Sequence, residues 1–85
     1  MPSKPPPRDD AQARLLREFG ARLRELREAR DMTQMALAHA AGLHPTYIGS
    51  VETGARNVAL LNLYALAAAL EVDLPELLPP GPPSA

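Results

Sequence analysis

The sequence has no cysteine and only two histidines, His39 and His44, which have no cluster of carboxylates beside them. Disulfides and thiolate zinc sites are therefore excluded, and we do not expect a metal site. The sequence also has no glycine-rich phosphate loop, and its few candidate residues do not suggest a Ser-His-Asp arrangement. We interpret the chain as a protein that is not an enzyme and uses no cofactor, and no small-molecule ligand is evident.

Aromatic residues are scarce, at 4% of the chain, whereas hydrophobic residues reach 46% with an excess of leucine and alanine. This composition suits a helical bundle better than a sheet. No apolar run approaches the roughly 18 residues that a membrane span needs, and the proline-rich, charged start contains no apolar signal region. We therefore expect one small all-α domain without a membrane segment, located in the cytoplasm.

An excess of positive charge is also missing, because nine Lys and Arg residues stand against ten Asp and Glu for a formal net charge of -1. This balance argues against binding nucleic acid through bulk positive charge. The distribution is uneven: residues 1–30 hold eight basic and five acidic residues, whereas residues 31–85 hold only Arg56 against five acidic residues. Any electrostatic attraction to nucleic acid would therefore have to come from the N-terminal third, from Arg56 and from helix N-termini.

Composition divides the chain into three parts. Residues 1–10 are rich in proline and poor in apolar side chains, so we expect a disordered arm. The functional alternatives are a basic arm that follows DNA and a polyproline ligand. Residues 11–78 form the predicted domain, whose first helix should run from about Ala11 to Arg30 because apolar residues recur there every three or four positions. Residues 79–85 are too rich in proline to continue a helix and form a disordered tail.

Two short helical patterns joined by Gly42 occupy the stretch from Thr33 to Asn57. Residues 34–41 and residues 47–51 each place apolar side chains on one helical face. Glycine is the natural residue for a left-handed turn between two such helices, and Thr33 is a suitable N-cap for the first of them. The pattern predicts a helix-turn-helix, a unit whose second helix can lie in the major groove of DNA.

The order T-Q-x-x-L-A-x-x-A-G-L-x-x-x-x-I-x-x-V-E-x-G-x-R-N resembles the phage-repressor and Cro type of helix-turn-helix, the XRE family. The likeness spans residues 19–78 and implies a compact five-helix repressor-like bundle that binds DNA and regulates transcription. A narrower similarity points to the controller proteins of restriction-modification operons and to small bacterial repressors. The residues that carry it are Thr46, Tyr47, Ile48, Glu52, Gly54, Arg56 and Asn57.

The resemblance and the helical spacing together predict a DNA-facing surface. In the family, the residue at Gln34 donates to a phosphate and the residue at His44 touches the DNA backbone. Helical spacing turns the small residues of the second helix away from the core, but Pro45 offers only apolar contact where controller-like sequences often carry arginine or glutamine. The predicted DNA-binding residues are Thr33, Gln34, His44, Pro45, Thr46, Tyr47, Gly49, Ser50, Arg56 and Asn57.

The resemblance also implies two structural contacts. The first is a partly buried ion pair between Arg27 and Glu52, which would hold the first helix to the third. The second is a dimer seam, because related small repressors associate through their fourth and fifth helices and the predicted fourth helix is more apolar than one buried face requires. The seam residues that we predict are Leu61, Tyr64, Leu77 and Leu78, and core packing is the alternative.

Two functions of different classes follow from these features. The first is a homodimeric transcriptional regulator, more naturally a repressor than an activator, that binds double-stranded DNA at a pseudo-palindromic operator. The second is a protein-interaction module, such as an antitoxin-like or adapter protein, that uses the helix-turn-helix as a scaffold. The acidic balance of residues 31–85 and the proline at position 45 favour this second function.

Overall fold

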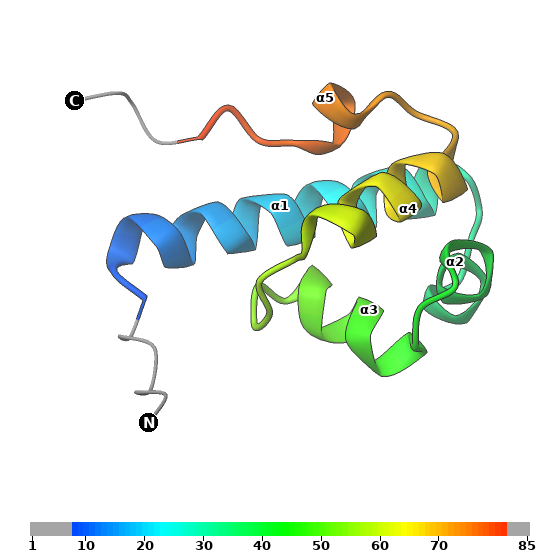
Figure 1. Ribbon diagram of the computed structural model, residues 1–85, viewed down its shortest axis with the longest axis horizontal. Helices are drawn as coiled ribbons and strands as arrows, with labels where there is room; N and C mark the ends of the chain where they lie inside the picture. The colour runs from blue at the N-terminus through cyan, green and yellow to red at the C-terminus, as the bar shows by residue number, and fades with distance from the viewer. Residues whose placement is uncertain (1–7, 82–85) are drawn as a thin grey trace.

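A computed structural model describes residues 8–81. Within this range the chain forms helices and no strand (Figure 1). Helices α1, α2 and α3 span Asp10–Ala29, Gln34–Ala41 and Pro45–Glu52, and α4 and α5 span Leu60–Leu70 and Leu74–Leu77. The predicted all-α, five-helix class is confirmed. Among these helices none has both the length and the apolar composition that crossing a membrane requires.

Helix α1 begins one residue earlier than predicted because of a capping box that the sequence analysis overlooked. The carboxylate of Asp9 accepts a hydrogen bond from the backbone N–H of Gln12 at 2.8 Å, and the side chain of Gln12 accepts one from the backbone N–H of Asp9 at 3.1 Å. Two of the four backbone donors that a helix start leaves unpaired are thereby satisfied. The predicted disordered arm therefore loses its last residues to α1, and residues 1–7 of that prediction lie outside the described range.

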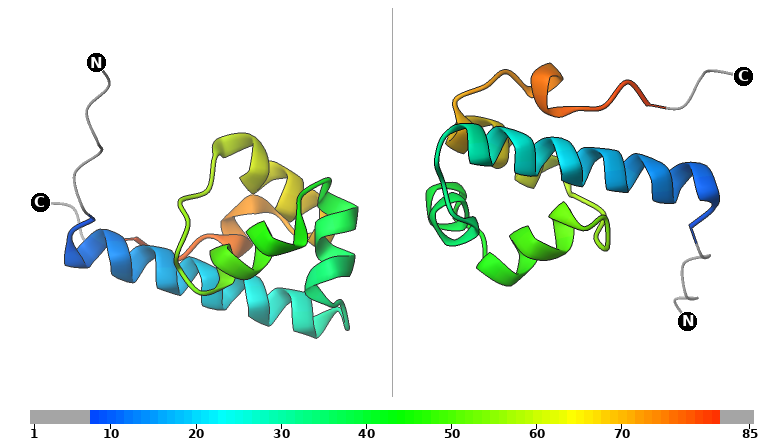
Figure 2. Two further views of the ribbon diagram at one scale, coloured as in Figure 1. Left: turned by 90° about the horizontal axis from the view of Figure 1, so that it is seen from below. Right: turned by 180° about the vertical axis from the view of Figure 1, so that it is seen from behind.

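The core is assembled from one apolar face of every helix. Helix α1 packs against α3 and α5, and α2 packs against both α3 and α4 (Figures 1 and 2). On α4 the buried face is Leu66, Ala67 and Leu70, whereas Leu60, on the uncapped first turn, remains exposed. The fully buried large side chains are Leu23, Leu37, Ile48, Val51, Leu66, Leu70 and Leu77.

Leu77 requires a correction, because the sequence analysis assigned it to a dimer seam. Its side chain has no exposed surface and belongs to the core cluster. The short helix α5 folds back over α1 and α4 and turns Leu77 inward, while Leu78, the next residue, is 42% exposed. Leu77 therefore stabilises the protomer and offers no surface to a second chain.

Two helix ends adopt a left-handed backbone without glycine. Asp31, after α1, has a φ of 55°, and Glu71, after α4, has a φ of 56°. This conformation costs about 1–2 kcal/mol for a residue with a β-carbon. The side chains of Arg30 and Glu71 form an ion pair that connects these two ends across the bundle.

The crossing of α1 and α3 depends on Gly20. A β-carbon built at Gly20 would lie 2.4 Å from the backbone oxygen of Val51 and 2.5 Å from that of Glu52. These distances are far shorter than any van der Waals contact, and both atoms belong to backbone that cannot rotate away. The absence of a side chain at residue 20 therefore sets how closely α1 approaches the end of the helix-turn-helix.

We predict that Gly20→Ala lowers the free energy of unfolding by about 1–3 kcal/mol, because the extra carbon forces α1 and α3 apart. Gly49→Ala is the matched control: its new β-carbon would meet only the flexible side chain of Gln34, at 3.5 Å. The control should be neutral or should gain up to about 1 kcal/mol from the better helix propensity of alanine. Chemical denaturation of both variants measures the difference, and equal stabilities would contradict the close crossing.

Candidate nucleic-acid interface

The turn between α2 and α3 is made by Gly42, whose φ of 70° and ψ of 33° are left-handed. The side-chain oxygen of Thr33 accepts the backbone N–H of Ala36 at 3.0 Å and so caps α2. After the turn, the N–H of Leu43 donates to the carbonyl of Ala38 at 2.8 Å. These contacts end α2, reverse the chain and start α3 within a few residues, which is the helix-turn-helix that the sequence predicted.

Helix α3 starts with His44 and Pro45. The Nδ1 atom of His44 accepts the backbone N–H of Thr46 at 3.1 Å, so an imidazole performs the capping role usually taken by a hydroxyl or carboxylate. Pro45 occupies the first helical turn, where its missing N–H costs nothing. His44 itself is exposed.

The surface of α3 that faces away from the core carries the predicted base-reading residues. Ile48 and Val51 are buried, whereas Thr46 is exposed and Gly49 and Ser50 are partly exposed. The hydroxyl of Ser50 donates to the backbone carbonyl of Thr46 at 3.0 Å, so the oxygen of Ser50 is left to act as a hydrogen-bond acceptor. This face is small and uncharged, which favours close approach to a groove over strong individual contacts.

The carboxylate of Glu52 is held by residues from two other helices. Nε and Nη2 of Arg27 donate to its two oxygens at 2.6 and 3.0 Å, and Nη1 of Arg27 donates to the carbonyl of Met32 at 2.7 Å. The side chains of Arg27 and Glu52 are only 10% and 4% exposed. The hydrogen bonds to Glu52 raise the pKa of Arg27 above its ordinary value, against the opposing effect of burial, so Arg27 stays charged.

Gln34 joins this network and does not simply extend into solvent. Its Nε2 atom donates to Oε1 of Glu52 at 3.0 Å, and the residue as a whole is exposed. A side-chain amide has two hydrogens, so one bond to Glu52 leaves a second N–H for the phosphate contact that we predicted. The sequence analysis did not foresee the Gln34–Glu52 bond, which links α2 to the end of α3.

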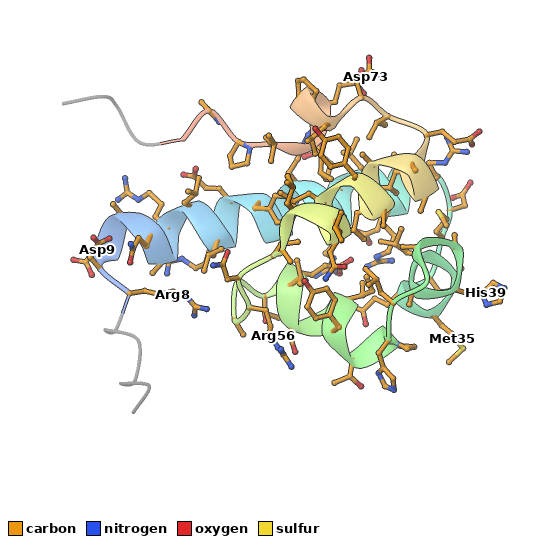
Figure 3. The ribbon with its side chains drawn as sticks, in the orientation of Figure 1. Arg8, Asp9, Met35, His39, Arg56 and Asp73 are labelled. Atoms are coloured by element: carbon orange, nitrogen blue, oxygen red, sulfur yellow. The ribbon has the colours of Figure 1, made fainter. Side chains whose placement is uncertain are left out.

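Arg56 lies over the ring of Tyr47, with its guanidinium carbon 5.6 Å from the ring centre. The hydroxyl of Tyr47 accepts a hydrogen bond from Nδ2 of Asn62 on α4 at 3.1 Å. Sequence analysis missed Asn62, because a lone asparagine on an apolar helix gives no local signal. Arg56 is exposed on the side of the molecule where α3 lies (Figure 3), and this cation–π contact orders its side chain before any ligand arrives.

Asn57 uses its side chain inside the loop, where Oδ1 accepts the backbone N–H of Val58 at 2.9 Å. This contact orients the loop, and the amide nitrogen of Asn57 is still able to donate to another group. Histidine, aspartate and glutamate side chains of residues 8–81 form no cluster of three that would bind a metal ion.

A capped α2, a left-handed glycine turn and a protruding α3 held by a buried ion pair define the class of DNA-binding helix-turn-helix regulators. The comparison with protein families agrees, because the model described as Helix-turn-helix (HTH_3) matches residues 23–77. The chain belongs to this helix-turn-helix family of DNA-binding transcription regulators, and the XRE-type resemblance is confirmed.

Several relatives share most of the domain. The control protein C.SmaI of Serratia marcescens is 48% identical over 56 residues, which are 66% of this chain and 67% of that protein. The control protein C.MunI of a Mycoplasma species is 43% identical over 60 residues, which are 69% of this chain and 81% of that protein. The crystal structure of the restriction-modification controller protein C.AhdI from Aeromonas hydrophila has a TM-score of 0.72 and 50% identity, covering 73% of this chain and 94% of that one.

We predict that Arg27→Ala lowers the free energy of unfolding by about 3 kcal/mol or more, because it leaves the carboxylate of Glu52 buried without its cation. Arg24→Ala is the matched control on the same helix, since Arg24 pairs with Glu28 in a largely exposed bridge that is worth about 0–1 kcal/mol. Thermal or denaturant unfolding monitored by circular dichroism compares the two. A loss at Arg27 no larger than the loss at Arg24 would show that the buried pair does not hold α1 to α3.

Proposed function

We propose that the chain is a homodimeric transcriptional controller that binds a pseudo-palindromic operator and represses transcription, without catalysis or a cofactor, in the cytoplasm. The observation that carries the target class is the similarity, at 41–50% identity, to proteins named as control proteins or as a restriction-modification controller. We therefore infer that its target is an operator that controls restriction-modification genes.

Association into a dimer is supported by the outer face of α4. Leu61 is 81% exposed and Tyr64 is 57% exposed, and Leu60 beside them is also largely exposed. Leu78 after α5, which we also predicted for the seam, is 42% exposed. Contiguous apolar surface of this kind marks an interaction site in a small domain, and a two-fold dimer would cover the same patch on both copies.

Recognition of the operator would combine weak base contacts with dimer geometry. Thr46 and Ser50 supply hydroxyl oxygens, and Pro45 supplies apolar contact, for example to a thymine methyl group. These contacts are weaker than the bidentate contacts of arginine or glutamine, so specificity must come in part from DNA shape. The spacing of two α3 helices, about 34 Å for one turn of DNA, supplies the rest.

The protein-interaction module remains the second candidate, and the same exposed α4 face favours it together with the acidic balance of residues 31–85. Gel filtration combined with binding to random duplex DNA separates the two functions. A dimer whose affinity for DNA falls steeply between about 50 and 200 mM salt supports the controller. A monomer without affinity for DNA at the lower salt rejects it.

We predict that Leu61→Glu weakens dimerisation at least tenfold, because it places like charges opposite each other at a two-fold contact. Met35→Glu is the matched control, since Met35 is 68% exposed and belongs to α2 and not to α4. Sedimentation equilibrium measures both. Equal dissociation of the two variants would contradict a dimer contact through α4. A failure of both variants to dissociate would contradict it as well.

We predict different effects of two DNA-facing substitutions. Arg56→Ala should weaken binding to every duplex and reduce the slope of log K against log salt by about one unit, because a phosphate contact is lost. Thr46→Ala should instead change the ranking of operators selected from a random pool, with little effect on that slope. Binding titrations at several salt concentrations test both variants. An unchanged ranking of operators for Thr46→Ala would contradict base recognition by α3.

A further inference from the structure

The N-terminal half of α1 lies outside the segment that matches the family. The match begins at residue 23, whereas α1 begins at Asp10. These first turns extend past the loop between α3 and α4 and beyond the rest of the bundle (Figure 2). A binding role for this half of α1 would therefore be an addition to the matched helix-turn-helix.

The arginines of the described residues fall into two groups, according to whether a glutamate neutralises them. The arginines with a glutamate partner are Arg22, Arg24, Arg27 and Arg30. The arginines that are exposed and form no ion pair with any residue between 8 and 81 are Arg8, Arg14, Arg17 and Arg56. All the cations in the second group are at the N-terminal end of α1 or in the loop after α3, so free positive charge is concentrated at one end of the domain.

Arg17 lies directly against the loop that carries Arg56. A β-carbon built on Gly54 would lie 2.8 Å from Cγ of Arg17 and 3.0 Å from its Cα. Gly54 is two residues before Arg56, and one turn further along α1 Gly20 touches the end of α3 in the same way. The side of α1 that bears Arg17 is therefore continuous with the end of α3 and with the surface that presents Arg56.

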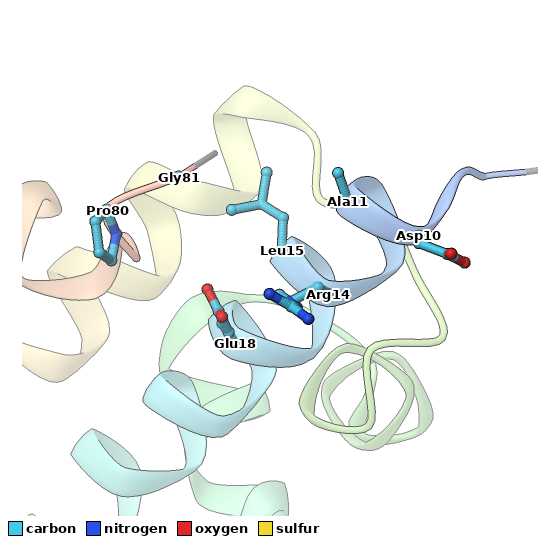
Figure 4. A pocket seen from close by; sticks show the side chains of 7 residues that line it. All are labelled: Asp10, Ala11, Arg14, Leu15, Glu18, Pro80 and Gly81. Atoms are coloured by element: carbon cyan, nitrogen blue, oxygen red, sulfur yellow. The ribbon is translucent and has the colours of Figure 1, made fainter. Parts of the chain in front are cut away.

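Arg14 faces a different part of the molecule. It lines a pocket between α1 and the C-terminal segment together with Glu18 and Pro80 (Figure 4). Glu18, the acidic residue next to Arg17 in the sequence, thus faces this pocket. Arg8 lies on the same side of α1 as Arg56 (Figure 3), but two aspartates follow it immediately and offset its charge. Arg17 is therefore the strongest candidate, and Arg14 is its natural control.

We propose that Arg17 binds a DNA phosphate beyond the base pairs that α3 covers, and so extends along the backbone the contact that begins at Arg56. The inference rests on the proposed function, because a phosphate comes within reach only when α3 lies in the groove. Among residues 8–81 the guanidinium of Arg17 has no ion-pair partner to give up, and it presents a planar set of donors that suits phosphate. The contact is to the backbone, so it strengthens binding to all sequences equally.

The test uses the full chain and duplexes of about 30 base pairs, one of random sequence and one selected for tight binding. Arg17→Gln keeps the β- and γ-carbons that pack beside Gly54 and removes only the charge. We expect it to weaken binding to both duplexes by the same factor. Because each lost contact reduces the salt slope by about 0.9, the advantage of the wild type should shrink about 3.5-fold as salt rises from about 50 to 200 mM.

Two further variants complete the test. Arg14→Gln removes an equal charge from another side of α1 and should keep the wild-type salt slope. Arg17→Lys should restore most of the slope that Arg17→Gln loses. Unchanged unfolding midpoints would show that all the variants are folded. The inference is overturned if Arg17→Gln keeps the wild-type slope, or if Arg14→Gln lowers the slope equally. A wild type that binds no duplex rejects the proposed function and this inference together, whereas a wild type that binds while Arg17→Gln is unaffected rejects the inference alone.

Discussion

The carboxylate of Glu52 is the point at which α1, α2 and α3, the helices around the candidate nucleic-acid interface, are joined. Arg27 from α1 and Gln34 from α2 both donate to it, and Arg27 also reaches the carbonyl of Met32 before α2 begins. Charged groups buried to this degree require full hydrogen-bond satisfaction to be tolerated, and in the described residues no buried side-chain polar atom lacks a partner. The network fixes the end of α3, while Gly20 allows α1 to lie against it.

Four arginines serve structure in this chain of net charge -1, which belongs to a DNA-binding family. The paired arginines contribute nothing to long-range attraction, because each is neutralised by a glutamate. Under the proposed function, the few free cations beside α3 would give a modest electrostatic contribution, and the small, uncharged face of α3 would add only weak base contacts. Affinity would then depend on the proposed association of two copies, and occupancy of an operator would rise steeply with protein concentration.

Local patterns predicted the features that depend on neighbouring residues. The left-handed Gly42 and the cap at Thr33 both follow from chemistry within one or two turns. The Arg27–Glu52 pair came from the family likeness and not from spacing, and the structure contains it. The capping box of Asp9 and Gln12 was present in the sequence as a known signal and was overlooked.

The features that could not be predicted depend on how distant segments meet. The bond between Asn62 and Tyr47, the bond between Gln34 and Glu52 and the contact at Gly20 join residues far apart in the sequence. Leu77 was misassigned for the same reason, because α5 is too short to show a periodic face and its packing decides which leucine turns inward.

The central claim is that α3, held by Glu52, meets DNA while the outer face of α4 meets a second copy. Mapping amide chemical shifts in the isotope-labelled dimer during titration with a duplex selected from a random pool tests this most directly. We expect the largest chemical-shift changes on Gln34, on Thr46 to Ser50 and on Arg56, whereas the shifts of Leu61 and Tyr64 should stay nearly unchanged. Changes confined to α4, with α3 unaffected, would contradict it.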